Sequence, residues 1–198
     1  SATKASAGKR LGDDPEMRGY KRIHLSEKTP EGEIVWEYGY QWREDGLFAC
    51  AVVEDEDHYP AKLTGAYEDM IHRNDSLQFF ANGGAKAEWN DNDFDNDDLE
   101  GLVGDTAEGV KTMVNLRPSA ATGDVSSYFR REGNRSAYEI FIPKSLLPGV
   151  KFEKGFHLGF LLMVNSRFPA KGAAAAFSTT GKIFPYKRPG VWPDVVFR

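Results

Sequence analysis

The sequence is poor in cysteine, because its 198 residues include a single one, Cys50. One cysteine cannot form a disulfide within the chain, which excludes the small domains that disulfides hold together and leaves the compartment open. A chain of this length buries roughly 70% of the surface that it would expose when unfolded, so a hydrophobic core can stabilise it without covalent links. We therefore expect a globular domain in which Cys50, within an apolar run, is buried and inert.

Long apolar runs and an excess of basic charge are also missing. No stretch reaches the roughly 20 apolar residues that a membrane-spanning helix needs, which excludes a membrane span. The formal net charge is -5, whereas binding to nucleic acid backbones needs clustered Lys and Arg, so we expect no nucleic acid partner. The first residues contain no apolar core, and we expect no signal peptide in this chain.

The motifs of the easily recognised enzyme classes are absent too. The chain contains no Gly-x-Ser-x-Gly elbow, no His-Glu-x-x-His zinc motif, no phosphate-binding loop and no Cys-x-x-Cys. The four histidines lie without ligand spacing. Carboxylates are so plentiful that a glycosidase-like acid pair stays open, but no particular pair stands out. The residues therefore identify no catalytic centre.

Strand patterns dominate the sequence. Residues 34–42 alternate between apolar and polar, residues 44–46 form a turn, and residues 47–53 are a continuous apolar run, which together predict a hairpin. Further strands are predicted at residues 20–25, 76–80, 110–116, 125–129, 137–142, 156–164 and 195–197.

Helix is expected only in short pieces, near residues 61–71 and 144–147. So many short strands with so little helix predict an all-β fold, an antiparallel β-sandwich of jelly-roll type. Residues 1–18 are small, polar and charged, so we interpret them as a flexible lead-in to one domain that spans residues 19–198.

Aromatic side chains recur at every second position of the predicted strand 34–42, at Trp36, Tyr38, Tyr40 and Trp42. This spacing places them on one face of the strand. A flat aromatic row could receive a polysaccharide chain, but one face of each sheet must pack on the other sheet, and such rings fill that space. We therefore expect the row to lie in the core.

Four short motifs form a further pattern, which consists in their order along the chain. They read WREDGLFACAVVEDED at residues 42–57, NDSLQFF at 74–80, YEIFIPKSLL at 138–147 and GFHLGFLLMVNSR at 155–167. In this order they resemble the family 9 carbohydrate-binding module and its DOMON-like relatives over about residues 42–168. The sequence departs from the family at Lys144, where Trp is usual, and residues 91–108 look like an insertion.

The resemblance implies an antiparallel β-sandwich that binds polysaccharide or oligosaccharide without cleaving it, and that often holds structural calcium. It also implies an extracellular or periplasmic location and an accessory role beside other domains of a parent protein. Two alternatives remain open: a structural domain of the same fold that binds no sugar, and a DOMON-type haem-binding electron-transfer domain in which Met163 pairs with a Lys or His from another strand.

Sugar sites combine an aromatic face with planar polar side chains that bond the hydroxyl groups. Asn165 matches the Val-Asn block of the family, where the Asn and an aromatic residue about three positions later face the sugar. The opposite wall is expected from the loop before Asp75, where His58, Tyr59 and Tyr67 are the available rings. Alternatively, the rings merely cover the sandwich end. The predicted sugar-binding residues are Tyr59, Tyr67, Glu68, Asn165, Arg167 and Phe168.

Two groups of acidic residues are candidate calcium ligands. Residues 91–98 place oxygen donors at alternate positions, as in loops that wrap a hard cation, although they lack the Gly and Glu of an EF-hand. The other group lies where the family has its acidic pair. A solvated acidic loop and the capping of turns are the respective alternatives. The predicted ligands are Asp91, Asp93 and Asp95 in the first group, and Asp55, Asp57 and Asp75 in the second.

Overall fold

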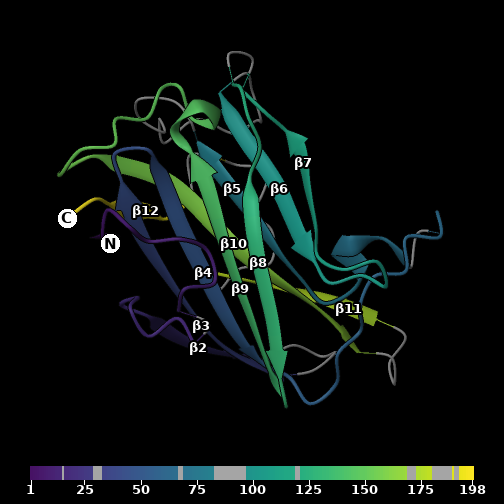
Figure 1. The fold of residues 1–198 in the computed structure, drawn as a ribbon. Helices are drawn as coiled ribbons and strands as arrows, with labels where there is room; N and C mark the ends of the chain where they lie inside the picture. Colours follow the sequence, from purple (N-terminus) through teal and green to yellow (C-terminus); the bar gives the residue numbers. More distant parts are fainter. Residues whose placement is uncertain are drawn as a thin grey trace.

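The computed structural model describes residues 1–14, 16–28, 33–66, 69–82, 97–118, 121–168, 173–179, 189 and 192–198, and the statements below concern these residues. They form two six-stranded sheets. Paired strands run antiparallel, apart from the parallel pair β1 and β3. The chain therefore has the antiparallel β-sandwich that the strand pattern predicts (Figure 1).

The first sheet has the strand order β1-β3-β4-β9-β8, with β2 paired to β3. The acidic turn at residues 44 and 45 joins β3 to β4, as the predicted hairpin requires. The strands are β1 (Thr3–Lys4), β2 (Ile23–Lys28), β3 (Glu33–Arg43), β4 (Gly46–Glu54), β8 (Ser126–Glu132) and β9 (Arg135–Pro143).

The second sheet has the order β11-β10-β5-β6-β7, with β12 paired to β10. Its longest strand, β10, pairs with β5 on one side and with both β11 and β12 on the other. The strands are β5 (Ser76–Asn82), β6 (Asp98–Gly104), β7 (Lys111–Leu116), β10 (His157–Phe168), β11 (Ala173–Ser178) and β12 (Asp194–Val196).

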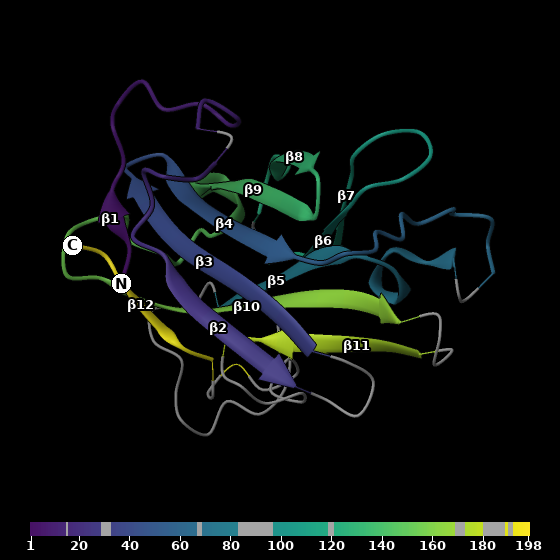
Figure 2. The same cartoon turned by 90° about the horizontal axis from the view of Figure 1, so that it is seen from below.

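The main core lies between the two sheets, which Figure 2 shows as stacked layers. All four rings of the aromatic row on β3 are buried there, as predicted. The Tyr40 ring meets Phe160 of β10 edge to face, with ring centroids 5.4 Å apart, so this pair joins the two layers. Cys50 points to the other face of its sheet, where burial raises the pKa of its thiol and keeps it unreactive.

The N-terminal segment packs against the sandwich, which corrects the expectation of a flexible lead-in. Ala2 is fully buried, and its backbone N–H donates to the Val196 carbonyl (2.9 Å). Farther along, Met17 and Tyr20 pack on the outer face of the first sheet, against a cluster that includes Phe48. The sequence could not show this, because small and polar residues carry no strand pattern and their partners are distant in the chain.

Glu139 holds this segment in place from the outer face of β9. Its side chain is fully buried and accepts hydrogen bonds from the Tyr20 hydroxyl (2.6 Å) and the Gly12 backbone N–H (2.8 Å). The Lys9 ammonium completes a nearly buried ion pair with it at 2.8 Å. Gly12 has a φ of +76°, and a Cβ there would lie 2.8 Å from the Tyr128 ring, so the close approach needs glycine.

Several element predictions differ from the structure. Strands β6 and β11 were not predicted, because β6 begins within the acidic stretch and β11 contains a run of four alanines. The helix expected at residues 61–71 is wrong for the part of it that the structure describes, because Ala61 forms a β-bridge with Thr106 and residues 62–66 contain no helix. Asp69 has 3-10 geometry, and the 3-10 turn η2 (Ile71–Arg73) lies at the end of the range. Near residues 144–147 the structure has the short 3-10 helix η3 (Lys144–Leu146). Among the described residues, no helix has the length and apolarity needed to cross a membrane.

Truncation of the ring that joins the layers tests the core. We expect Phe160→Ala to lower the free energy of unfolding by about 3–5 kcal/mol, because it removes a fully buried ring and leaves a cavity. Chemical denaturation measures the change. Met113→Ala is the control, because Met113 is 47% exposed on β7 and should change stability little. Equal effects of the two substitutions would contradict this description of the core.

Removal of the buried charge tests the anchor of the N-terminal segment. We expect Glu139→Gln to lower the free energy of unfolding by about 3 kcal/mol, because it leaves the Lys9 ammonium nearly buried without a counter-charge. Amide hydrogen exchange should also accelerate in residues 5–20. The control is Glu44→Gln, which breaks the exposed pair with Lys4 and should cost less than about 1 kcal/mol. Unchanged exchange in the segment would show that Glu139 does not anchor it.

Candidate functional site

The predicted site residues that the structure describes gather at one end of the sandwich. There β4 and β10 end, and β5 begins after the loop at residues 55–75. Tyr59, Asp55 and Asp57 come from this loop, Asp75 ends it, and Asn165, Arg167 and Phe168 come from the end of β10. Tyr67, Glu68, Asp91, Asp93 and Asp95 lie outside the described residues.

Asp75 is the centre of this arrangement, which we call the Asp75 cluster: Asp55, His58, Tyr59, Asp75 and Arg167. The nearly buried Asp75 carboxylate accepts a hydrogen bond from the Tyr59 backbone N–H at Oδ2 (2.6 Å) and another from the Arg167 backbone N–H at Oδ1 (2.9 Å). In return, the Tyr59 carbonyl accepts a hydrogen bond from the Asp75 N–H (3.1 Å). One carboxylate thus fixes the loop against the end of β10.

Tyr59 and Arg167 form the half-buried surface of the cluster. The guanidinium carbon of Arg167 lies 5.9 Å from the centre of the Tyr59 ring, within cation–π distance. Nη1 of Arg167 donates to the Asn74 side-chain oxygen (2.9 Å), which restrains the guanidinium group. The structure therefore brings together an aromatic ring and a planar group with several donors.

The other two predicted residues of β10 have different surroundings. Asn165 lies on the same face of the strand as Arg167, but it is nearly buried and its amide donates to the Ser76 hydroxyl (3.1 Å). Phe168 lies on the opposite face, where it is half-buried against the main core and its ring meets Phe177 with centroids 6.4 Å apart. Alternation along β10 thus separates the Phe168 ring from Asn165 and Arg167.

The acidic residues of the loop serve the protein's own hydrogen bonds, as the capping interpretation predicts. Asp55 accepts from the Ser166 hydroxyl (3.2 Å) and from the Asp57 backbone N–H (3.2 Å). Burial, followed by the nearby charge of Asp75, raises the pKa of the Asp55 carboxyl. In the described part of the chain, no three His, Cys, Asp or Glu side chains are grouped so that they could hold a metal ion.

Asp105, Phe129 and Arg131 also contribute to this end, and the sequence assigns a role to none of them. The His58 ring lies between two carboxylates, with Nδ1 3.2 Å from Asp75 and Nε2 3.2 Å from Asp105, and it stacks on Phe129. Arg131 of β8 donates to the Asp55 carbonyl (2.9 Å) and so fixes the start of the loop. Arg131, Asp105 and Phe129 come from distant parts of the chain, and no spacing in the sequence links them to the loop.

Met163, the candidate haem ligand, lies on the outer face of the second sheet. It is 3% exposed and packs with Phe80, Leu161 and Trp192, so apolar side chains enclose its thioether. His157 is on the same strand but exposed at its other end, where it faces Asp194.

Solved structures with a similar fold include two sugar complexes. A family 9 carbohydrate-binding module from Caldicellulosiruptor kristjanssonii in complex with glucose superposes with a TM-score of 0.71 and 16% sequence identity, covering 100% of this chain and 94% of that chain. The same module in complex with cellotriose gives the same TM-score and identity, with 92% of that chain covered.

A third similar structure is a protein from Bacteroides uniformis ATCC 8492, provisionally named a carbohydrate-binding protein. Its TM-score is 0.62 at 11% identity, and the match covers 100% of this chain and 97% of that chain. No protein-family model matches the chain, and a comparison with curated protein sequences finds no match. The likeness shows that the chain has the fold of the family 9 modules.

The ion pairs of His58 make the stability of this end depend on pH. Burial lowers the pKa of the ring, but the Asp75 and Asp105 carboxylates outweigh burial and raise it above its ordinary value. A base whose pKa is raised by folding stabilises the protein fully below its unfolded-state pKa, and this stabilisation is lost as pH rises through the folded-state pKa. We therefore expect the stability difference between the wild type and His58→Gln to be full at acidic pH and to shrink as the pH rises above about 6.5, the ordinary pKa of histidine.

Denaturant titrations across this pH range measure the difference. His24→Gln is the matched control, because the His24 ring is exposed on β2 and lies 3.7 Å from its only described acidic partner, Glu37. A stability difference for His58→Gln that grows with pH would contradict the ion pairs with Asp75 and Asp105.

Proposed function

We propose that this chain is a non-catalytic carbohydrate-binding domain, and that it holds a saccharide at the Asp75 cluster. The observation that carries the proposal is the fixed pair of Tyr59 and Arg167. A half-exposed ring offers a flat apolar face to a sugar ring, and the adjacent guanidinium group offers donors to its hydroxyl oxygens. The fold it shares with modules seen in complex with glucose and cellotriose supports this assignment.

The pair is prepared for binding before any ligand arrives. Asp75 fixes the backbone of both residues, and Asn74 fixes the guanidinium group of Arg167. A ligand therefore does not pay the full entropic cost of ordering these side chains, which favours affinity. In contrast, Asn165 and Phe168 contribute mainly to packing: the first through its bond to Ser76 and the second through Phe177.

The biological setting that we propose follows from the same assignment. A domain that binds polysaccharide without cleaving it serves as an accessory to an extracellular polysaccharide-degrading or polysaccharide-binding protein, where it holds its partner domains near the substrate. Its ligand is a polysaccharide or oligosaccharide. The proposal assigns no catalytic residue to the domain.

Titration of cello-oligosaccharides, followed by calorimetry and by retention in affinity gels, tests the site. We expect Tyr59→Ala and Arg167→Ala each to weaken binding about tenfold, because each removes a contact of about 1–1.5 kcal/mol. Phe168→Ala should lower stability more than affinity, because its ring packs on the core side of β10.

Arg117→Ala is the matched control for the loss of an arginine, because Arg117 pairs with Asp124 away from the cluster. If the wild type is retained no better than an inert protein on every polysaccharide tested, the chain is a structural domain of this fold without sugar binding. If both cluster variants bind like the wild type, the site lies elsewhere.

A further inference from the structure

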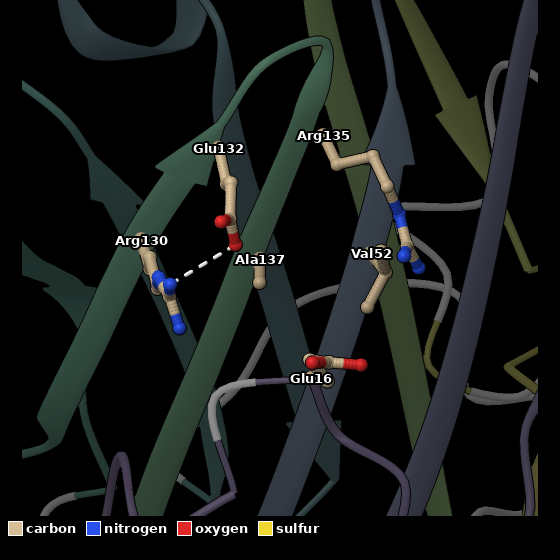
Figure 3. A pocket seen from close by; sticks show the side chains of 6 residues that line it. All are labelled: Glu16, Val52, Arg130, Glu132, Arg135 and Ala137. Carbon is tan, nitrogen blue, oxygen red and sulfur yellow. Dashed lines mark ion pairs between the residues drawn. The ribbon is translucent and has the colours of Figure 1, made fainter.

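The outer face of the first sheet contains a hollow on the side of the sheet away from the core. Its volume is about 220 Å³, and it is lined by Glu16, Val52, Arg130, Glu132, Arg135 and Ala137. Figure 3 shows Val52 and Ala137 between Arg130 on one side and Arg135 on the other. Clefts for drug-sized ligands measure roughly 300–1,000 Å³, so this hollow fits a smaller ligand, of about one sugar ring.

The register of three strands builds the hollow. Val52 of β4 pairs with Ala137 of β9, which pairs with Arg130 of β8, so their side chains form one row on the same face. In the next row Arg135 lies between Glu132 of β8 and Glu54 of β4. The floor is therefore apolar and carried by rigid strands, while the walls are charged.

The charges of the walls are unequally satisfied. Glu132 forms an ion pair with Arg130 at 3.0 Å, and Glu16 forms an ion pair with Arg18. Within the described ranges no carboxylate forms an ion pair with Arg135, whose guanidinium group lies beside Val52 in Figure 3. Arg135 therefore offers a planar set of donors that matches a carboxylate in two parallel hydrogen bonds.

We propose that this hollow is a second binding site that takes a hexuronate, a sugar ring that carries a carboxylate. The carboxylate binds Arg135, and the ring lies over the floor, where Val52 and Ala137 are nearly buried. The oxygens of Glu132 and Glu16 accept hydrogen bonds from its hydroxyl groups. A neutral hexose lacks the group that Arg135 would bind, so the hollow discriminates against it.

The hollow and the Asp75 cluster lie on opposite faces of β8 at neighbouring residues. Arg130 lines the hollow, whereas the next residue, Arg131, donates to the Asp55 carbonyl at the start of the cluster loop. The inference therefore extends the proposed carbohydrate binding to a second ligand class, but it uses none of the residues assigned to the first site.

Titration with glucuronate, observed through the methyl NMR signals of Val52 and Ala137, tests the hollow. We expect these signals to shift with glucuronate and not with glucose. Arg135→Ala should weaken glucuronate binding about tenfold, and Arg135→Lys about threefold, because lysine keeps the charge but loses the paired donors. Arg117→Ala again controls for the loss of a surface arginine.

This design tests the two proposed sites independently. Tyr59→Ala should leave the glucuronate shifts unchanged, and Arg135→Ala should leave the binding of cello-oligosaccharides unchanged. Unmoved Val52 and Ala137 signals, equal shifts with glucose, or full affinity in Arg135→Ala would each overturn the hexuronate site. The cello-oligosaccharide titration decides the Asp75 cluster independently of these results.

Discussion

The alternation of side chains along each strand is the constraint on which the rest of this structure depends. Once the aromatic row of β3 faces the main core, every second residue of the strands paired to it must face the same way. The remaining residues form the outer face, where Glu139 and the hollow lie. On β10 the same rule puts Arg167 outward and Phe168 inward. Core packing thus decides which side chains are available for binding.

Both layers use buried carboxylates to fix segments without regular structure. Glu139 accepts donors from the N-terminal segment, and Asp75 accepts donors from the loop and from the end of β10. Hydrogen bonds to a charged acceptor are stronger than neutral ones, and each of these acceptors would be costly to leave unpaired. These two carboxylates therefore hold segments that lie outside the sheets.

The fold was predictable where the pattern was local. The hairpin at residues 34–53 has clear alternation, an acidic turn and an apolar run, and all three are present in β3 and β4. Strand β6 was missed because its pattern is masked by acidic neighbours, and the packed N-terminal segment was missed because Lys9 and Glu139 are far apart in sequence.

The candidate site was likewise predictable only where its residues follow a local pattern. Tyr59 and Arg167 follow from the sugar-site pattern, and the structure places them together. Which face of β10 each residue would occupy required the direction of the core, which the sequence pattern around Phe168 does not reveal. His58 and Arg131 depend on partners from separate strands, and only the assembled sheets bring them to the loop.

The two ends of the chain lie side by side in Figures 1 and 2. Ala2 forms a parallel β-bridge with Phe197 there. They meet where β3 ends and β10 begins, whereas the Asp75 cluster is at the opposite ends of β4 and β10. A short covalent bridge between the first and last residues would thus close the chain into a ring without touching the cluster. New ends could then be opened in an exposed turn, which makes the fold suitable for circular permutation.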